Sequence, residues 1–419
     1  MADIVVGAGV IGLHIALYLQ KSGRDVIVLD RNEADHNCSY GNAGYISPSH
    51  FIPLATPGMV WQGLKWMLDN QSPFYIKPRL NANLIKWGWL FWKNAKHRTV
   101  QKNAPHLFRL LKLSRSLSID LHEELGQSFT LKQDGCLMLY TNKKTGHEEE
   151  VLARQAKNDY GLDVPVLDNR ELKLLDPLIS NKVLGGAYYK IDCHLHPREM
   201  MNVLKARLVE KGVKIVLNEN IKSLDVHGRV LQNVITDCAT YPVDNFIIAA
   251  GSWSPLLCTQ LGIDLPLQAG KGYSHTYQQP HHNIQYPAIL VDHRVAMTPM
   301  GNDLRVGGTM EIGGLDLNVS RQRIPPIIQA ANLYYNDLNL PVPPVDQVWA
   351  GLRPVSPDGL PYIGKDQNYK NVFVATGHAM IGISSAAATG LLLSQMITGQ
   401  TPEIPMDVFR VNRFCPGSS

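Results

Sequence analysis

The first thirty residues restrict the fold more than any other part of the chain. Asp3–Val6 is a short apolar run with β-branched residues, which predicts a buried strand. The pattern Gly7-Ala8-Gly9-Val10-Ile11-Gly12 follows it, and apolar residues then recur at helical spacing from Leu13 to Lys21. Asp25–Asp30 predicts a second strand that ends in an acid. This order predicts a βαβ unit that binds a dinucleotide.

Each glycine of the motif has a physical reason. Gly7 permits the tight turn, Gly9 lets the backbone approach a pyrophosphate, and Gly12 lets the helix pack closely on the strands. The helix N-terminus then presents free N–H groups and the positive end of its dipole to the phosphates. Asp30 ends the second strand, where a carboxylate can accept hydrogen bonds from the adenosine ribose.

Composition excludes several other classes of protein. Of the 419 residues, 45% are hydrophobic and 18% are charged, which is typical of a globular protein and not of a disordered or fibrous chain. No apolar stretch is long enough to predict a membrane span, and the N-terminus does not resemble a signal peptide, so we expect a cytoplasmic protein. The six cysteines are scattered, and His194-Leu195-His196 is interpreted as a surface or packing pair, so no metal site is predicted.

Two later segments look like returns to the first sheet. Asp244–Trp253 is an apolar strand that ends in a glycine turn, and Asn371–His378 is another. A small, apolar run from Gly382 to Leu393 follows the second and predicts a helix buried against a cofactor. The N-terminus of such a helix would stabilise the negative charge that a flavin gains at its N1–C2=O edge on reduction. These features favour FAD over NAD.

Several ordered motifs resemble a known superfamily. They are Cys38–Gly44, Lys271-Gly272-Tyr273-Ser274, Trp349–Gly364 and Ala375–His378. In these motifs the chain is similar to the FAD-dependent amine oxidoreductases, the superfamily of D-amino acid oxidase, glycine oxidase and sarcosine oxidase. Within it, the chain most resembles the small subunit of bacterial D-amino acid dehydrogenases, over nearly its whole length.

The resemblance implies an α/β fold with two interleaved parts. One is a Rossmann-like FAD-binding domain made from 1–50, 190–265 and 345–419. The other is an α+β substrate domain made from 51–189 and 266–344, with a mixed sheet that covers the flavin. The helical pattern that begins at His196 and the strand pattern of Gly212–Leu217 are consistent with a further βαβ piece of the first sheet.

The resemblance also implies the cofactor contacts. FAD would lie against Gly7, Gly9, Val10, Ile11, Gly12, Asp30, Arg31, Ser39, Asn42, Ala43, Gly44, Ile46, Val216, Ala250, Gly251, Trp253, Gly351, Arg353, Gly377, His378, Ile381 and Gly382. Sarcosine oxidases attach FAD through a cysteine near the position of Arg353. This chain has no cysteine between Cys258 and Cys415, so we expect FAD to be held noncovalently.

The substrate candidates follow from the chemistry of an amino acid. Its carboxylate suits a planar, charged guanidinium, and Arg353 matches the carboxylate-binding arginine of glycine oxidase; the alternative is an Arg353–Asp358 pair across the turn. Tyr273 is a second candidate, as a hydroxyl donor to the carboxylate or as a wall of the pocket; the alternative is an ordinary strand residue. His378 and His50 are further candidates for the catalytic site, although His378 could equally cap a helix.

Residues 51–115 stand out by charge. They contain eleven lysines and arginines and one acid, while the net charge of the whole chain is +4, and they contain five of the seven tryptophans. A basic, tryptophan-rich element of this kind can sit at an anionic membrane surface, or can be a pair of packed helices with a solvated basic face. Because a dehydrogenase must pass its electrons onward, we predict peripheral contact with a membrane that carries a quinone. Nucleic-acid binding is not expected.

The sequence therefore predicts FAD-dependent oxidative deamination of D-amino acids, D-proline or a hydroxyproline among them. The product would be an imino acid, then a 2-oxo acid and ammonia, with the electrons passed to a quinone or another acceptor. One alternative is an oxidase of the glycine or sarcosine type that uses oxygen. A nicotinamide-linked dehydrogenase would leave the Ala375–His378 and Lys271–Ser274 motifs unexplained. A flavin-binding assembly or sensor protein without turnover would not need Arg353.

Overall fold

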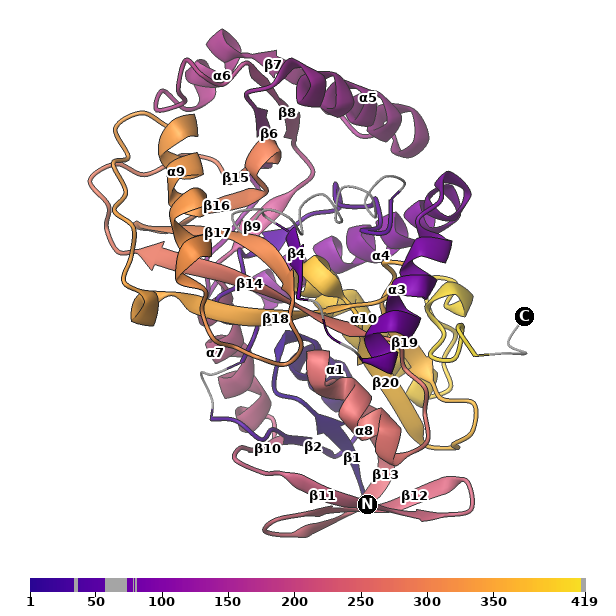
Figure 1. The fold of residues 1–419 in the computed structure, drawn as a ribbon. Coiled ribbons are helices and arrows are strands. Elements are labelled where there is room, and N and C mark those ends of the chain that lie inside the picture. Colours follow the sequence, from indigo (N-terminus) through magenta and orange to yellow (C-terminus); the bar gives the residue numbers. More distant parts are fainter. Residues whose placement is uncertain (34–36, 57–73, 78, 80, 416–419) are drawn as a thin grey trace.

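The computed structural model describes residues 1–33, 37–56, 74–77, 79 and 81–415. Two large sheets and their helices build the molecule (Figure 1). Residues of both sheets line a cavity. Segments distant in sequence lie together in both sheets, so the chain passes repeatedly from one to the other. The α/β fold with mixed sheets that the sequence predicts is confirmed.

The first sheet is parallel at its centre. Its parallel strands lie in the order β10 (Lys214–Val216), β2 (Val26–Leu29), β1 (Ala2–Val6), β13 (Thr240–Ile248) and β20 (Val372–Thr376). β19 (Tyr362–Lys365) adds antiparallel to β20. The first half of β13 pairs with a hairpin, β11 (Ile221–His227) and β12 (Val230–Thr236). Both strand returns that the sequence predicts therefore join the sheet of the βαβ unit.

Helices cover both faces of this sheet. They include α1 (Val10–Lys21), α7 (Pro197–Glu210), α8 (Ser254–Gln260), α10 (Gly382–Ile397) and the long α4 (His97–Glu124). α10 packs closely on α1, because a Cβ at Gly390 would lie 2.6 Å from the backbone of His14. Among the described residues, Ala379–Ile397 has the length and apolar composition of a membrane span, yet most of it is buried against α1 and α4 as a core helix.

The second sheet is mixed. Its strands run in the order β18 (Trp349–Val355), β14 (Gln268–Tyr277), β17 (Asp303–Ile312), β16 (Val295–Met300), β15 (Ala288–Leu290), β6 (Cys136–Tyr140), β8 (Gly185–Tyr189) and β7 (Val166–Asp168). β4 (Phe74–Ile76) pairs parallel with β17, and β15 pairs parallel with β6. α9 (Ile324–Tyr334) packs on this sheet, and α5 (Lys143–Tyr160) and α6 (Asn169–Leu175) lie at its far end (Figure 1).

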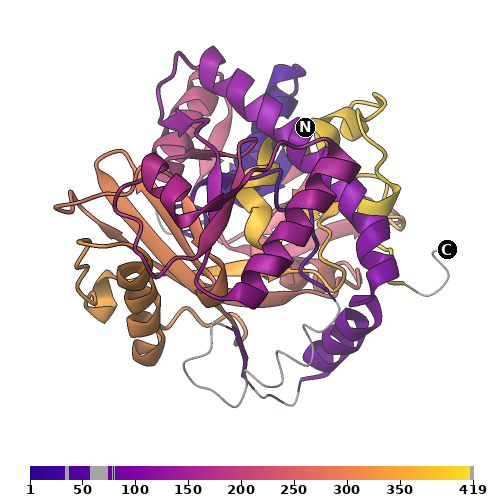
Figure 2. The ribbon, with the colours of Figure 1, turned by 90° about the horizontal axis from the view of Figure 1, so that it is seen from above.

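Smaller elements complete the fold. β3 (Tyr45–Ile46), β9 (Cys193–Leu195) and β5 (Leu131–Lys132) form a three-stranded sheet. α3 (Ala82–Asn94) lies near the edge of the molecule in both ribbon views (Figures 1 and 2). The division into two domains stays a prediction, and two elements depart from it. β18 joins the second sheet, although the sequence assigns residues 345–419 to the first domain. α4 packs on α10 beside the first sheet, although the sequence assigns residues 51–189 to the substrate domain.

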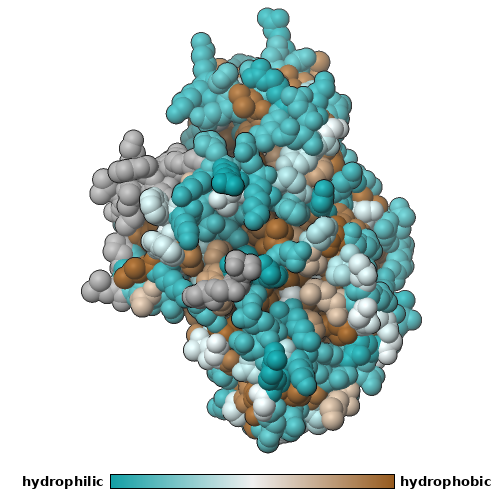
Figure 3. Space-filling model, turned by 90° about the vertical axis from the view of Figure 1, so that its right-hand side faces the viewer, coloured by the Kyte–Doolittle hydropathy of each residue, from teal (hydrophilic) through white to brown (hydrophobic). Residues whose placement is uncertain are grey.

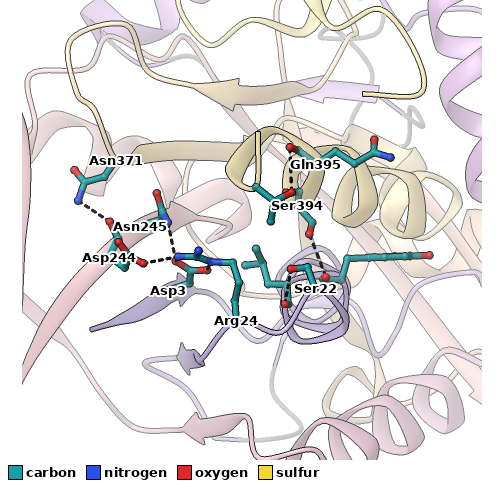
Figure 4. Close-up of polar contacts among 11 residues, drawn as sticks. Asp3, Ser22, Arg24, Asp244, Asn245, Asn371, Ser394 and Gln395 are labelled. Atoms are coloured by element: carbon teal, nitrogen blue, oxygen red, sulfur yellow. Dashed lines mark hydrogen bonds and ion pairs between the residues drawn. The ribbon is translucent and has the colours of Figure 1, made fainter. Parts of the chain in front are cut away.

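Polar contacts, some of them at the surface, fix the ends of the first sheet opposite the cavity. Arg24 pairs with Asp3 of β1, to which it donates from Nη2 at 2.8 Å, and with Asp244 of β13 at 2.5 Å (Figure 4). Asn371 donates to the backbone carbonyl of Asp244 at 2.9 Å and so brings β20 into the same network. These contacts hold β1, β13 and β20 in register without occupying the cavity end of the strands.

Candidate functional site

A cavity of about 580 Å³ lies at the carboxyl ends of the parallel strands. Its walls come from β1, β2, β20 and the turn after β13 in the first sheet, and from β14, β17 and β18 of the second. Ligands of open α/β sheets bind at this edge, because the loops that follow parallel strands converge there. The cavity is therefore the candidate site.

The glycine motif forms a cradle at one end of the cavity. Gly7 has φ +115°, and a Cβ there would lie 2.4 Å from the carbonyl oxygen of Ala249. A Cβ at Gly12 would lie 1.8 Å from the carbonyl oxygen of Gly7, so this glycine sets the packing of α1 on the turn. Gly9 borders the cavity. A Cβ at Gly9 would lie 3.4 Å from its nearest neighbour, Ser39 Oγ. The cradle fits the pyrophosphate of a dinucleotide.

The acid at the end of β2 lies beside this cradle. Asp30 accepts hydrogen bonds from the backbone N–H of Ala8 at 2.7 Å and of Asn32 at 2.9 Å, and its side chain lines the cavity. The guanidinium of Arg31 stacks over the ring of Trp253, 4.6 Å from its centroid. All three predicted residues therefore lie at the end of the cavity where an adenosine would bind.

The start of α10 forms another wall. Residues 379–384 line the cavity, and Ser384 Oγ donates to the carbonyl of Tyr45 at 2.7 Å and accepts from the N–H of Ser47 at 3.1 Å. These contacts join the helix N-terminus to the loop after β3. The positive end of the helix dipole thus lies at the cavity, as the sequence predicts.

Arg353 lies in the cavity wall on β18. Its Nη1 donates to the carbonyl of Thr309 at 2.6 Å, and no carboxylate of the described residues forms an ion pair with it. Burial lowers the pKa of Arg353 to about 10, so the guanidinium stays charged at neutral pH. The alternative partner, Asp358, is bound instead by Arg413 at 2.8 and 2.9 Å. A half-buried cation that lines a cavity is suited to an anionic group of a ligand.

Tyr273 is buried and also reaches the cavity. Its hydroxyl donates to Glu311 at 3.1 Å and accepts from the N–H of Ser320 at 3.3 Å. Glu311 in turn lies within 3.8 Å of the Lys271 ammonium, which is itself buried. The hydroxyl is thus already held by protein groups, which favours Tyr273 as a wall of the site.

Both candidate histidines line the cavity and are neutral. Burial lowers the pKa of His378 to about 3, and its Nε2 lies 3.1 Å from the hydroxyl of Thr389 on α10. Burial lowers the pKa of His50 to about 4, and its Nδ1 lies 3.1 Å from Ser49 Oγ. His378 is thus held by α10, while His50 has its second ring nitrogen free of protein hydrogen bonds among the described residues.

The comparisons with known proteins agree with this geometry. Residues 4–396 match the model of the DAO family, described as FAD dependent oxidoreductase. The chain belongs to this family. FAD is therefore its cofactor, and the resemblance inferred from the sequence motifs is confirmed.

Curated relatives and solved structures of the family match over the full chain. The D-amino acid dehydrogenase of Vibrio vulnificus is 32% identical over 98% of this chain and 99% of its own. The D-amino acid dehydrogenase of Granulibacter bethesdensis is 30% identical over 96% of this chain and 97% of its own. The fold is similar to that of glycine oxidase from Geobacillus kaustophilus, with a TM-score of 0.77 at 20% identity, covering 98% of each chain. L-proline dehydrogenase from P. horikoshii gives a TM-score of 0.76 at 19% identity, covering 99% of this chain and 97% of its own.

Five of the residues predicted to contact FAD lie behind the cavity wall: Gly12, Gly44, Ile46, Val216 and Gly377. They support residues that do line it. The carbonyl of Val216, for example, accepts from the N–H of Asp30 at 2.9 Å. A Cβ at Gly44 would lie 2.1 Å from the carbonyl oxygen of Leu195, so Gly44 permits a close backbone contact. The other predicted cofactor residues lie in the wall itself.

Several residues that line this cavity are not predicted from the sequence. Glu219, Asn220 and Ile221 follow β10 and reach the cavity next to Asp30, as the rule for carboxyl ends of parallel strands could have predicted. Arg305 of β17 is buried and donates to the carbonyls of Tyr40 at 3.1 Å and Asn42 at 2.6 Å. No local pattern marks Arg305, because its role depends on how β17 faces a loop far away in sequence.

Proposed function

We propose that this chain is an FAD-dependent D-amino acid dehydrogenase. It would convert the amino acid to an imino acid by loss of two electrons and two protons, and water would then hydrolyse the imino acid to a 2-oxo acid and ammonia. FAD supplies the hydride acceptor for this chemistry, at N5 of its ring system. The two curated relatives described above carry the name D-amino acid dehydrogenase and match nearly the whole chain, which supports this choice.

The charged guanidinium of Arg353 in the cavity wall, which forms no ion pair with a carboxylate of the described residues, is the observation that carries the proposal. An α-amino acid brings a carboxylate, and an arginine can hold it through two parallel hydrogen bonds. Thr309 occupies Nη1, so the remaining N–H groups are free to orient the acid. The helix N-terminus at residues 379–384 would stabilise the negative charge that develops on the reduced cofactor.

The proposed electron acceptor is a quinone in a membrane, reached through peripheral contact. On α3, Ile85, Trp89 and Trp92 are 65%, 56% and 59% exposed, and Lys93 lies over the Trp89 ring. Trp87 is buried and donates to the carbonyl of Val355 at 2.9 Å, which fixes the helix beside the cavity wall. Figure 3 shows the side on which α3 lies in Figure 1, where apolar patches interrupt a hydrophilic surface. Trp61 and Trp66 of the predicted segment lie outside the described residues.

The experiment is an anaerobic visible spectrum of the FAD-loaded protein, titrated with D- and L-amino acids, glycine, sarcosine and both proline series. We expect bleaching of the flavin by a set of D-amino acids. Readmitted air separates the two acceptor classes, since an oxidase recovers its colour quickly and a dehydrogenase stays bleached until a quinone is added. Bleaching by glycine or sarcosine alone would favour the oxidase alternative, and a flavin that no amine bleaches would favour the assembly or sensor alternative.

A further inference from the structure

Three polar side chains form a chain of hydrogen bonds that leads from the protein interior to the cavity. Asp192 is fully buried, and its carboxylate accepts from the N–H of Ser49 at 3.1 Å and from Ser49 Oγ at 2.5 Å. Ser49 Oγ lies 3.1 Å from Nδ1 of His50, and His50 lines the cavity. The sequence interpretation named His50 but neither of the other two, because Asp192 lies far away in the chain, in the turn before β9.

The charge state of Asp192 decides which groups donate and which accept along these hydrogen bonds. When the carboxylate is ionised it can only accept, so the single hydroxyl proton of Ser49 points to Asp192. Ser49 Oγ then offers only a lone pair to His50, and His50 must carry its proton on Nδ1. Nε2 is left with a lone pair, and no hydrogen bond to the described residues occupies it.

Besides Ser49, the hydroxyl of Ser47 lies at the Asp192 carboxylate and lowers its pKa by hydrogen bonding. Arg115 of α4 is the cation near Asp192, and it donates its Nε to the carbonyl of Ile191 at 2.6 Å. The other titratable groups that affect or are affected by Asp192 are Cys136 of β6, Tyr189 of β8, Cys193 of β9 and Tyr45 of β3, all buried or half-buried and uncharged at neutral pH. For His50, burial is the one cause that lowers the pKa, and it favours the neutral ring.

We propose that Asp192 and Ser49 are positioning residues that hold His50 in the Nδ1–H tautomer, so that Nε2 accepts a hydrogen bond from the amino group of the substrate. The inference rests on the proposed function, because an amino acid supplies the donor. Arg353 would hold the carboxylate and His50 the amine, and two fixed points orient the α-carbon.

The hydrogen bonds from Asp192 through Ser49 also make the tautomer of His50 dependent on pH. Burial raises the pKa of Asp192 to about 7. Once protonated, the carboxyl group donates to Ser49 Oγ, Ser49 turns its proton to Nδ1, and the proton of His50 moves to Nε2. Nε2 then repels an ammonium group instead of accepting from it. Substrate binding through the amine is therefore expected above about pH 7 and lost as the pH falls through this value.

The first test needs no substrate. Nitrogen NMR spectra of the FAD-loaded protein with ¹⁵N-labelled histidine, with His50→Gln used for assignment, distinguish the two neutral tautomers. We expect the Nδ1–H form of His50 at pH 8 and the Nε2–H form at pH 6, with no such change in Asp192→Asn. The Nε2–H form at both pH values would overturn the inference, whatever the enzyme oxidises.

The second test measures binding. The apparent Kd of the D-amino acid that bleaches the flavin best, and that of the same acid without its amino group, are compared from pH 6 to 8. For the amino acid, we expect Ser49→Ala to weaken binding roughly tenfold at pH 8, the order of one hydrogen bond to a charged group, and to remove the pH step. For the acid without an amine, neither effect is expected.

A matched control is Ser118→Ala, which removes another buried serine whose hydroxyl donates only to the carbonyl of Ser114 on its own helix. It should leave both Kd values unchanged. Equal losses for the two ligands in Ser49→Ala, or an unchanged pH step, would overturn the inference. Absence of bleaching by any amino acid would instead count against the proposed function, and the nitrogen spectra would be unaffected.

Discussion

The carbonyl of Thr309 accepts a hydrogen bond from Nη1 of Arg353 at 2.6 Å, and Thr309 itself has a left-handed backbone, with φ +69°. The strain has a local origin. The register of β14 and β17 shifts between Lys271 and Tyr273, so two residues of β17 oppose one residue of β14. The bulge turns the Thr309 carbonyl toward Arg353, and Gly272 leaves room for the guanidinium.

Replacing Arg353 tests the carboxylate contact. Arg353→Lys keeps a charge but loses the planar fork, so we expect the Kd of the amino acid to rise about 10- to 100-fold, the order of one or two charged hydrogen bonds. Titration of the anaerobic flavin spectrum measures this Kd. The affinity for FAD, measured in the same preparation, shows how far the cofactor contact of Arg353 changes as well, and an unaltered amino acid Kd would exclude the carboxylate contact.

Gly272 and Thr309 both contact Arg353, and replacing them should have different effects on substrate binding. In Gly272→Ala the new Cβ would lie 2.2 Å from Nη1 of Arg353, so the guanidinium must move and substrate binding should weaken. Thr309→Gly keeps the carbonyl and relieves the left-handed backbone, so binding should persist and stability should rise by up to about 1 kcal/mol. Gly88→Ala, on α3 with open space around it, is the control for an added methyl group. Thermal unfolding and the Kd titration give both quantities.

Two glycines of the first turn should fail in different ways. Gly9 has φ −76°, an ordinary value, so Gly9→Ala should fold normally and bind FAD at least about tenfold more weakly, because the methyl group crowds the pyrophosphate. Gly12→Ala places a Cβ 1.8 Å from the carbonyl oxygen of Gly7 and should destabilise the fold itself. Fluorescence titration with FAD and thermal unfolding without it separate the two effects. Normal FAD affinity in Gly9→Ala would contradict the cradle.

The proposed membrane contact depends on exposed, not buried, tryptophans. The double variant Trp89→Glu and Trp92→Glu removes apolar surface and adds negative charge, so we expect it to abolish cosedimentation with vesicles of anionic phospholipid at low salt. Flavin bleaching in solution should be unchanged. Wild-type protein that stays in the supernatant would end the proposal, and neutral vesicles provide the comparison for charge.

Acid stability should depend on buried histidines. Burial lowers the pKa of His14 to about 4 in the folded protein, from 6.5. The unfolded chain therefore takes up a proton first as the pH falls, and stability declines between pH 6.5 and 4, by up to about 3 kcal/mol for this group. His14→Gln should lose less stability than the wild type between pH 7.5 and 5, measured by urea unfolding. His97→Gln, at an exposed position, should follow the wild type.

Local patterns predicted the first sheet well and the cavity only in part. The βαβ unit and the strands that end near Gly251 and Gly377 follow from apolar runs and glycine turns, which are short-range signals. Arg353 came from resemblance to a family motif. Asp192, Arg305 and the Thr309 bulge could not be found in this way, because each acts through a register or a contact between segments far apart in the chain.

The order of strands in the first sheet has a consequence for biosynthesis. β1 and β2 are made at the start. β13, which pairs with β1, and β20, which pairs with β13, are complete only after residues 248 and 376 have been made. The glycine cradle therefore has an open parallel edge for most of translation, and neither half of the chain can complete it alone. Folding of the FAD site must wait for nearly the whole polypeptide, so truncation before β20 should yield a chain that depends on chaperones and does not retain flavin.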